Sequence, residues 1–135
     1  MFPQNNGAAT YQSVGAQSII ETADQHKLVE MLYTGAISRI NAAKSHLEMG
    51  NVANKGKTIS NVIAIVEELR RTLDMEHGGE LANNLHDLYE YMKSRLLQAN
   101  LNNDADILDE VKGLLEKLLD GWQQIPEEAR QAYNA

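Results

Sequence analysis

The sequence predicts an all-α fold: an antiparallel up-down four-helix bundle with an N-terminal segment that is extended or forms a short helix. Proline occurs only at Pro3 and Pro126, so no residue between them breaks a helix by lacking an amide donor. Between these prolines, apolar residues recur in steps of three and four, which is the spacing of one helix face. Short polar or glycine-containing stretches divide the pattern into four parts, and short connections make consecutive helices antiparallel.

The first expected elements are an N-terminal lead and a long helix. The lead covers residues 1–21, is partly extended, and has a short helix near residues 16–21. The sequence at 22–25, Thr-Ala-Asp-Gln, has the spacing of a capping box, in which the Thr22 hydroxyl and the Gln25 side chain satisfy each other's backbone N–H groups. The helix should therefore begin at Thr22 and run to about Met49, where Gly50 ends it.

Three further helices complete the predicted bundle, which occupies residues 22–125. The second should cover residues 52–77 and the third residues 80–100. Asp104 or Asn103 should cap the fourth, and residues 126–135 form a C-terminal tail. The predicted inward positions are Val29, Leu32, Ala36, Ile40, Ala43 and Leu47; Ile59, Val62, Val66, Leu69 and Leu73; Leu81, Leu85, Leu88, Met92, Leu96 and Ala99; and Leu108, Val111, Leu115, Leu118, Trp122 and Ile125.

The first long helix has more apolar residues than its inward face needs. A bundle helix buries a stripe about three residues in seven wide, and the remaining apolar side chains would flank that stripe, partly exposed to water. Contiguous exposed apolar surface usually marks an interaction site. These flanking residues are Leu28, Met31, Tyr33 and Ile37 on the first helix, with Ile63, Ile65, Tyr89, Tyr91, Ile107 and Leu114 on the other three.

Three kinds of cover would explain this apolar surface, and periodicity does not distinguish them. The flanking residues could be edges of the core, shielded by long Lys and Glu side chains and by the N-terminal lead. They could form a homodimer face. They could instead form a groove for the apolar face of helices from another protein, which is a known mode of peptide recognition.

Composition and charge argue against several classes of function. The chain has 12 basic and 19 acidic residues and a net charge of −7, which repels phosphate backbones and anionic lipids. We therefore expect neither nucleic acid nor a membrane as partner. The N-terminus lacks the basic and apolar regions of a signal peptide, so the predicted location is cytoplasmic. Without cysteine, the chain can form no disulfide, thiolate metal site or thiol nucleophile.

No motif indicates catalysis, a metal or a cofactor. The sequence Gly-Lys-Thr at 56–58 matches the end of a P-loop, but Asn51 stands where the earlier glycine is required, and no strand is predicted before it. The His-x-x-x-Glu pairs that begin at His26 and His86 could suggest a metal. Bundle metal sites use Glu-x-x-His, which is absent from the sequence, so surface ion pairs are the better interpretation. We expect no enzymatic activity.

Several longer stretches resemble the FliS family of flagellar export chaperones over nearly the whole chain. These are KLVEMLYTGAISRINAAK, EELRRTLDMEHGGELANNLHDLYEYM, and RLLQANLNND followed by EVKGLLEKLLDGW. Two features depart from the family pattern: Thr34 replaces an acidic residue, and the segment before Lys27 lacks the usual Ser-Pro start. The matching positions include Met31-Leu32-Tyr33, Gly35-Ala36, Leu73-Asp74, Gly78-Gly79-Glu80, Asn84-Leu85, Leu88-Tyr89, Tyr91 and Trp122.

The resemblance implies a non-catalytic cytoplasmic chaperone that binds the disordered C-terminal segment of flagellin. Such a protein prevents premature polymerisation and delivers flagellin to the flagellar export gate, with other flagellar regulators as further partners. The alternative is a structural or regulatory bundle that self-associates, as a homodimer, and has no client. In the chaperone interpretation the flagellin-binding groove is formed by Leu28, Met31, Leu32, Tyr33, Ile37, Ile63, Tyr89 and Met92.

Four apolar residues stand out in the otherwise polar N-terminal lead. In the chaperone interpretation, they would form a displaceable lid that covers the groove when no client is bound, and the alternative is a permanently docked arm. These residues are Tyr11, Val14, Ile19 and Ile20.

Overall fold

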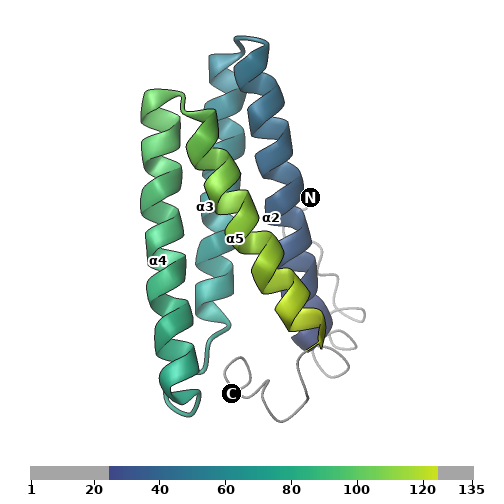
Figure 1. The fold of residues 1–135 in the computed structure, drawn as a ribbon, viewed down its shortest axis with the longest axis vertical. Helices are drawn as coiled ribbons and strands as arrows, with labels where there is room; N and C mark the ends of the chain where they lie inside the picture. Colours follow the sequence, from purple (N-terminus) through teal and green to yellow (C-terminus); the bar gives the residue numbers. More distant parts are fainter. Residues whose placement is uncertain (1–24, 125–135) are drawn as a thin grey trace, which may run out of the picture.

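The computed structural model describes residues 25–124, which form four antiparallel helices (Figure 1). They are α2 (Gln25–Glu48), α3 (Val52–Arg71), α4 (Gly79–Asn102) and α5 (Ala105–Gln124). The chain runs up α2, down α3, up α4 and down α5, so the predicted all-α four-helix bundle is confirmed. The N-terminal lead, Thr22, Ile125 and the C-terminal tail lie outside the described residues.

The helices are arranged as a ring around one core. The main contacts join α2 to α3, α3 to α4, α4 to α5 and α5 back to α2, so α2 and α4 lie diagonally opposite each other. Figure 1 shows α5 starting beside the end of α4 and crossing toward the start of α2. Fully buried side chains from all four helices fill the centre, among them Val29, Ile40, Val62, Leu69, Leu96, Leu108 and Leu115.

The turn between α2 and α3 follows the predicted stop signal. Gly50 has a φ of 71°, a left-handed conformation that glycine adopts without steric cost. The Asn51 side chain then caps α3 by accepting a hydrogen bond from the Asn54 N–H at 3.2 Å. The sequence therefore locates this turn correctly, at the end of the bundle shown uppermost in Figure 1.

The turn between α4 and α5 uses both predicted capping residues. Asn103 ends α4 in the left-handed conformation with a φ of 52°, which asparagine tolerates better than most residues. The Asp104 carboxylate accepts hydrogen bonds from the N–H groups of Asp106 and Ile107 at 3.0 and 3.3 Å. Asp104 is thus the N-terminal cap of α5, and Asn103 completes the preceding helix.

The predicted end of the second helix at residue 77 is wrong, because α3 ends at Arg71. The Thr72 hydroxyl donates to the Leu69 carbonyl at 2.6 Å, and Asp74 accepts from the N–H groups of Glu76 and His77, both at 3.1 Å. These side chains give the backbone partners that compete with a continuing helix. Leu73 keeps the apolar spacing and is buried, but it belongs to the turn.

The inward face of α4 also differs from the prediction. Leu81 is 43% exposed, whereas Ala82 and Tyr89 are completely buried. Tyr89 was expected on a flank, but its hydroxyl lies 2.5 Å from that of Tyr33 on the diagonal helix α2, and both side chains are buried. Ala82 precedes Tyr89 by seven residues, or about two helical turns, so the two side chains point to the same side of α4. With Tyr89 inward, Ala82 is therefore inward in place of Leu81.

Candidate functional site

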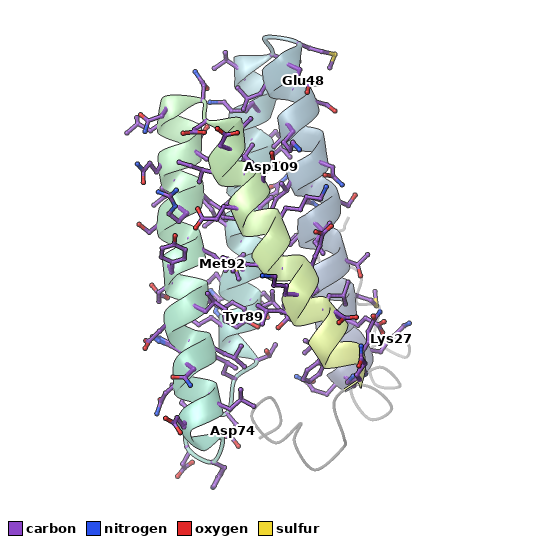
Figure 2. The ribbon with its side chains drawn as sticks, viewed as in Figure 1. Lys27, Glu48, Asp74, Tyr89, Met92 and Asp109 are labelled. Atoms are coloured by element: carbon purple, nitrogen blue, oxygen red, sulfur yellow. The ribbon has the colours of Figure 1, made fainter. Side chains whose placement is uncertain are left out.

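The structure divides the eight predicted groove residues into two groups. Leu32, Tyr33, Tyr89 and Met92 are buried in the core, and Figure 2 shows where Tyr89 and Met92 lie along α4. The expectation that Tyr33 and Tyr89 flank the core is therefore wrong, and Ile107 is likewise buried. Met31 is 46% exposed, while Leu28, Ile37 and Ile63 are partly buried against the core.

Leu28 and Met31 lie on the flank of α2 that faces α3. A Cβ atom on Gly35 would lie 3.8 Å from the Ile65 side chain of α3, so this side of α2 meets α3. Leu28 and Met31 precede Gly35 by two turns and one turn, which places them on the same side of the helix. Met31 thus contributes apolar surface beside the α2–α3 contact.

Ile37 lies on the other flank of α2, which faces α5. It precedes Lys44 by two helical turns, and Lys44 pairs with Asp109 of α5. Residues nine positions apart, such as Leu28 and Ile37, point in opposite directions from a helix. The predicted groove residues of α2 therefore do not form one continuous face.

A groove of about 530 Å³ lies on the outer surface where α3 meets α4. Ile63 is the predicted site residue that lines it. The lining is apolar in its middle and charged at one end, where Glu67 and Arg71 of α3 meet Lys93 of α4. The full lining set is Ser60, Ile63, Ala64, Glu67, Arg71 and Lys93.

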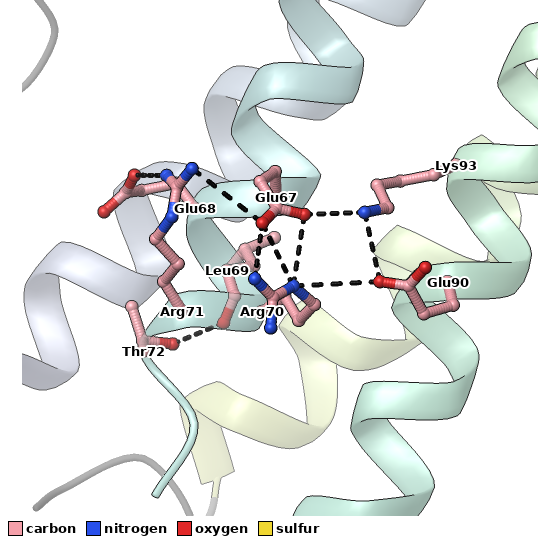
Figure 3. A network of polar contacts seen from close by, with 8 residues as sticks. All are labelled: Glu67, Glu68, Leu69, Arg70, Arg71, Thr72, Glu90 and Lys93. Carbon is pink, nitrogen blue, oxygen red and sulfur yellow. Dashed lines mark hydrogen bonds and ion pairs between the residues drawn. The ribbon is translucent and has the colours of Figure 1, made fainter.

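An ion-pair network forms the charged end of this groove (Figure 3). Glu67 accepts hydrogen bonds from Lys93 at 2.6 Å and from Arg70 at 2.5 Å, and Glu90 lies 3.0 Å from Lys93. Hydrogen bonds from Arg70 and then Lys93 lower the pKa of Glu67 from 4.5 to about 2, although desolvation opposes the shift. Glu67 is therefore ionised at neutral pH, and its charge is neutralised by neighbouring cations.

A buried lysine holds the other end of the α3–α4 contact together. The Lys55 side chain is only 3% exposed, and its ammonium group donates to the Asn100 carbonyl at 2.9 Å and to the Asn103 side chain at 2.6 Å. Asn100 lies in the last turn of α4 and Asn103 is its C-terminal cap, and the helix dipole favours a positive charge at this end. Lys55 thus fixes the start of α3 against the end of α4.

Exposed apolar residues continue along this α3–α4 face beyond the groove. Leu97 lies one turn after Lys93 on α4 and is 60% exposed, and Leu101 follows one further turn on and is 82% exposed. Val52 lies one turn before Gly56 on α3 and is also 60% exposed. Because a Cβ atom on Gly56 would lie 3.7 Å from the Asn100 side chain, Val52 lies on the side of α3 that faces α4.

The sequence interpretation missed these three residues. Leu96 and Leu97 are adjacent and therefore point about 100° apart on a helix, so at most one of them can occupy the centre of the inward face. Leu96 is completely buried, which leaves Leu97 outside. Leu97 and Leu101 repeat with a spacing of four, and this second apolar line was the available signal. We call Val52, Ile63, Ala64, Leu97 and Leu101 the α3–α4 apolar face.

The opposite end of the bundle is closed by a contact between α2 and α5. The Trp122 indole N–H donates to the His26 carbonyl at 2.9 Å, and the His26 ring hydrogen-bonds to the Trp122 carbonyl, also at 2.9 Å. The two rings stack with centroids 4.6 Å apart. Gln123 adds a hydrogen bond to Glu30 at 2.7 Å. The C-terminal turn of α5 is therefore fixed to the first turn of α2.

Neither a metal site nor a membrane-spanning helix is found in the described part of the chain. Residues 25–124 contain no group of three or more His, Cys, Asp or Glu side chains that could hold a metal ion. None of the helices described there is long and apolar enough to cross a membrane. The predicted lead residues Tyr11, Val14, Ile19 and Ile20 lie outside the described range.

A helical bundle with neighbouring apolar side chains exposed on one outer face has a surface typical of proteins that bind other polypeptides. The family model described as "Flagellar protein FliS" matches residues 7–129. The chain belongs to the FliS family, as expected from its motifs.

Three relatives in the family are similar over most of their length. A "Flagellar secretion chaperone FliS" of Salmonella typhimurium is 45% identical over 92% of this chain and 93% of the relative. "Flagellar secretion chaperone FliSB" of Pseudomonas aeruginosa is 42% identical over 85% and 91%, respectively. "Flagellar secretion chaperone FliS" of Vibrio cholerae is 38% identical over 87% of each chain. The relatives thus carry chaperone names.

Proposed function

We propose that this protein is a cytoplasmic secretion chaperone that binds the disordered C-terminal segment of flagellin. It keeps the segment from polymerising prematurely and delivers it to the flagellar export gate. Membership of the FliS family, whose compared members are named flagellar secretion chaperones, is the observation that carries this proposal. The exposed apolar side chains of the bundle supply the physical means of binding.

The distribution of this surface favours a client that wraps around the bundle. Met31 is exposed beside α3, Ile37 faces the α5 side, and Leu97 is exposed on the α3–α4 apolar face. One straight helix cannot cover several flanks, whereas a flexible chain can. Ordering such a chain costs free energy, and burial of apolar surface at several places offsets that cost. Release needs no nucleotide, because transfer to a later partner shifts the equilibrium by mass action.

We also propose that the N-terminal lead covers part of this surface before the client binds, through Tyr11, Val14, Ile19 and Ile20. Deletion of residues 1–15 should then increase the binding of a dye that fluoresces on exposed apolar surface. Unchanged dye binding by the truncated protein would argue against this role of the lead.

The client site is tested by calorimetric titration with a peptide that contains the flagellin C-terminal segment. Leu97→Asp should weaken binding about tenfold or more, the loss typical of a central contact residue. Leu81→Asp is the matched control: Leu81 is also an exposed leucine of α4, but it points about 160° away around the helix. Circular dichroism must show that both variants are folded. Equal loss of affinity in both variants would contradict the assignment of the α3–α4 apolar face.

The size of the protein in solution separates a chaperone from a self-associating bundle. Light scattering after size-exclusion chromatography should show a complex of higher mass only when the flagellin peptide is added. A stable dimer that ignores the peptide would support the alternative of a structural or regulatory bundle without a client.

A further inference from the structure

Acidic and basic residues are unequally distributed over the four helices. Helix α5 is the most acidic of the four, whereas in α3 the cations outnumber the carboxylates. The chain as a whole has a net charge of −7. Helix α5 contains Asp106, Asp109, Glu110, Glu116 and Asp120 against Lys112 and Lys117. Helix α3 contains Lys55, Lys57, Arg70 and Arg71 against Glu67 and Glu68.

Two cations on α3 remain available to a partner. Lys57 is exposed and forms no ion pair with any residue between 25 and 124. The Arg71 side chain is 58% exposed and lies 3.8 Å from the Glu67 carboxylate and 2.8 Å from its closest partner, the exposed carboxylate of Glu68. An exposed pair of this kind contributes little stability, so a carboxylate from a bound chain can replace Glu68 at small cost.

Lys57 and Arg71 lie on the same side of α3, at the two ends of the groove region. Ala64 lines the groove, and it follows Lys57 and precedes Arg71 by seven residues in each case. A spacing of seven residues is about two helical turns, so the three side chains share one line along the helix. The two cations are therefore about 21 Å apart along the axis, with the groove residue Ala64 midway between them.

We infer that the segment docking on the α3–α4 apolar face has apolar residues flanked by carboxylates, one meeting Lys57 and the other meeting Arg71. Complementary charge fixes the register of such a segment and excludes others. Carboxylates in the flanks would be attracted to α3 and repelled by α5, whereas basic side chains would be repelled by α3 and attracted to α5. These interactions act within a screening length of about 8–10 Å. The inference rests on the proposed function, since the segment belongs to the client.

The test measures the affinity of the flagellin C-terminal peptide for three variants at low and high salt. Lys57→Glu should weaken binding about three- to tenfold at low salt, and Lys57→Gln should weaken it less. Lys117→Glu is the matched control, because it makes the same change of net charge at an exposed lysine of acidic α5. The difference between Lys57→Glu and Lys117→Glu should shrink as salt rises.

The possible results separate this inference from the proposed function. A wild-type protein that binds no flagellin peptide overturns the proposed function and the inference with it. Wild-type binding that Lys57→Glu leaves unchanged, strengthens, or weakens no more than Lys117→Glu overturns the inference alone. Circular dichroism of the variants excludes unfolding as the cause of any loss.

Discussion

Replacing Lys55 by methionine tests whether a single buried ammonium group fixes the α3–α4 contact. Methionine keeps most of the apolar stem but removes the group that donates to the Asn100 carbonyl and the Asn103 side chain. Each hydrogen bond from a charged donor contributes about 1.5–3 kcal/mol, and a cation near a helix C-terminus contributes about 0.3–1 kcal/mol more. The substitution also removes the cost of burying a charge, which offsets part of this loss.

We therefore expect Lys55→Met to lower the free energy of unfolding by about 2–3 kcal/mol, which corresponds to roughly 10 °C in Tm. Urea titration followed by circular dichroism measures the change, and a constant m value would show that the unfolded state is unaltered. Lys57→Met is the matched control, since Lys57 is an exposed lysine on the same helix. A loss for Lys55→Met no larger than that for Lys57→Met would refute the reasoning.

Two glycine substitutions should have effects of opposite sign on the free energy of unfolding. Gly113→Ala, inside α5 with no neighbouring atom in the way of a Cβ, should stabilise the protein by about 0.5–1 kcal/mol. Gly50→Ala should destabilise it by about 1 kcal/mol because the backbone there is left-handed. Thermal unfolding should therefore give a higher Tm for Gly113→Ala and a lower Tm for Gly50→Ala than for the wild type. The pH dependence of stability tests Glu67, whose pKa is lowered from 4.5 to about 2. Because the folded state holds this carboxylate ionised, its contribution is present above pH 4.5 and is lost as the pH falls toward 2. Glu67→Gln should therefore flatten the stability profile in that window more than Glu68→Gln, and identical profiles would contradict the role of the network.

Local sequence patterns predicted most of the bundle, because helix starts and stops depend on neighbouring residues. Asp104 and Gly50 each act on the backbone within a few positions, and the structure places both turns where these residues predicted them. The end of α3 was missed because Leu73 continues the apolar spacing, while Asp74 makes a tight turn. At this place the apolar spacing favours a continuing helix and the Asp74 side chain favours a turn, and the structure has the turn.

The candidate site was less predictable because it depends on which helices are neighbours. Tyr33 shares the helical spacing of Val29 and Ala36, but no local pattern shows that its hydroxyl meets that of Tyr89, 56 residues away in the sequence. The split between Met31 and Ile37 likewise follows from the ring order, with α3 on one side of α2 and α5 on the other. Periodicity identifies an excess of apolar residues on α2, but it does not show which neighbouring helix lies beside each of its two flanks.

The His26–Trp122 contact has a practical consequence, because Trp122 is the only tryptophan of the chain. Its ring stacks on His26, where the last turn of α5 contacts the first turn of α2. Tryptophan fluorescence of the unlabelled protein, excited where tyrosine does not absorb, therefore reports on a single place, at the end of the bundle remote from Leu101 and Val52. A change in emission upon client binding would indicate that the client reaches this junction or alters it from a distance, and a Leu97→Asp variant could be titrated optically without any attached label.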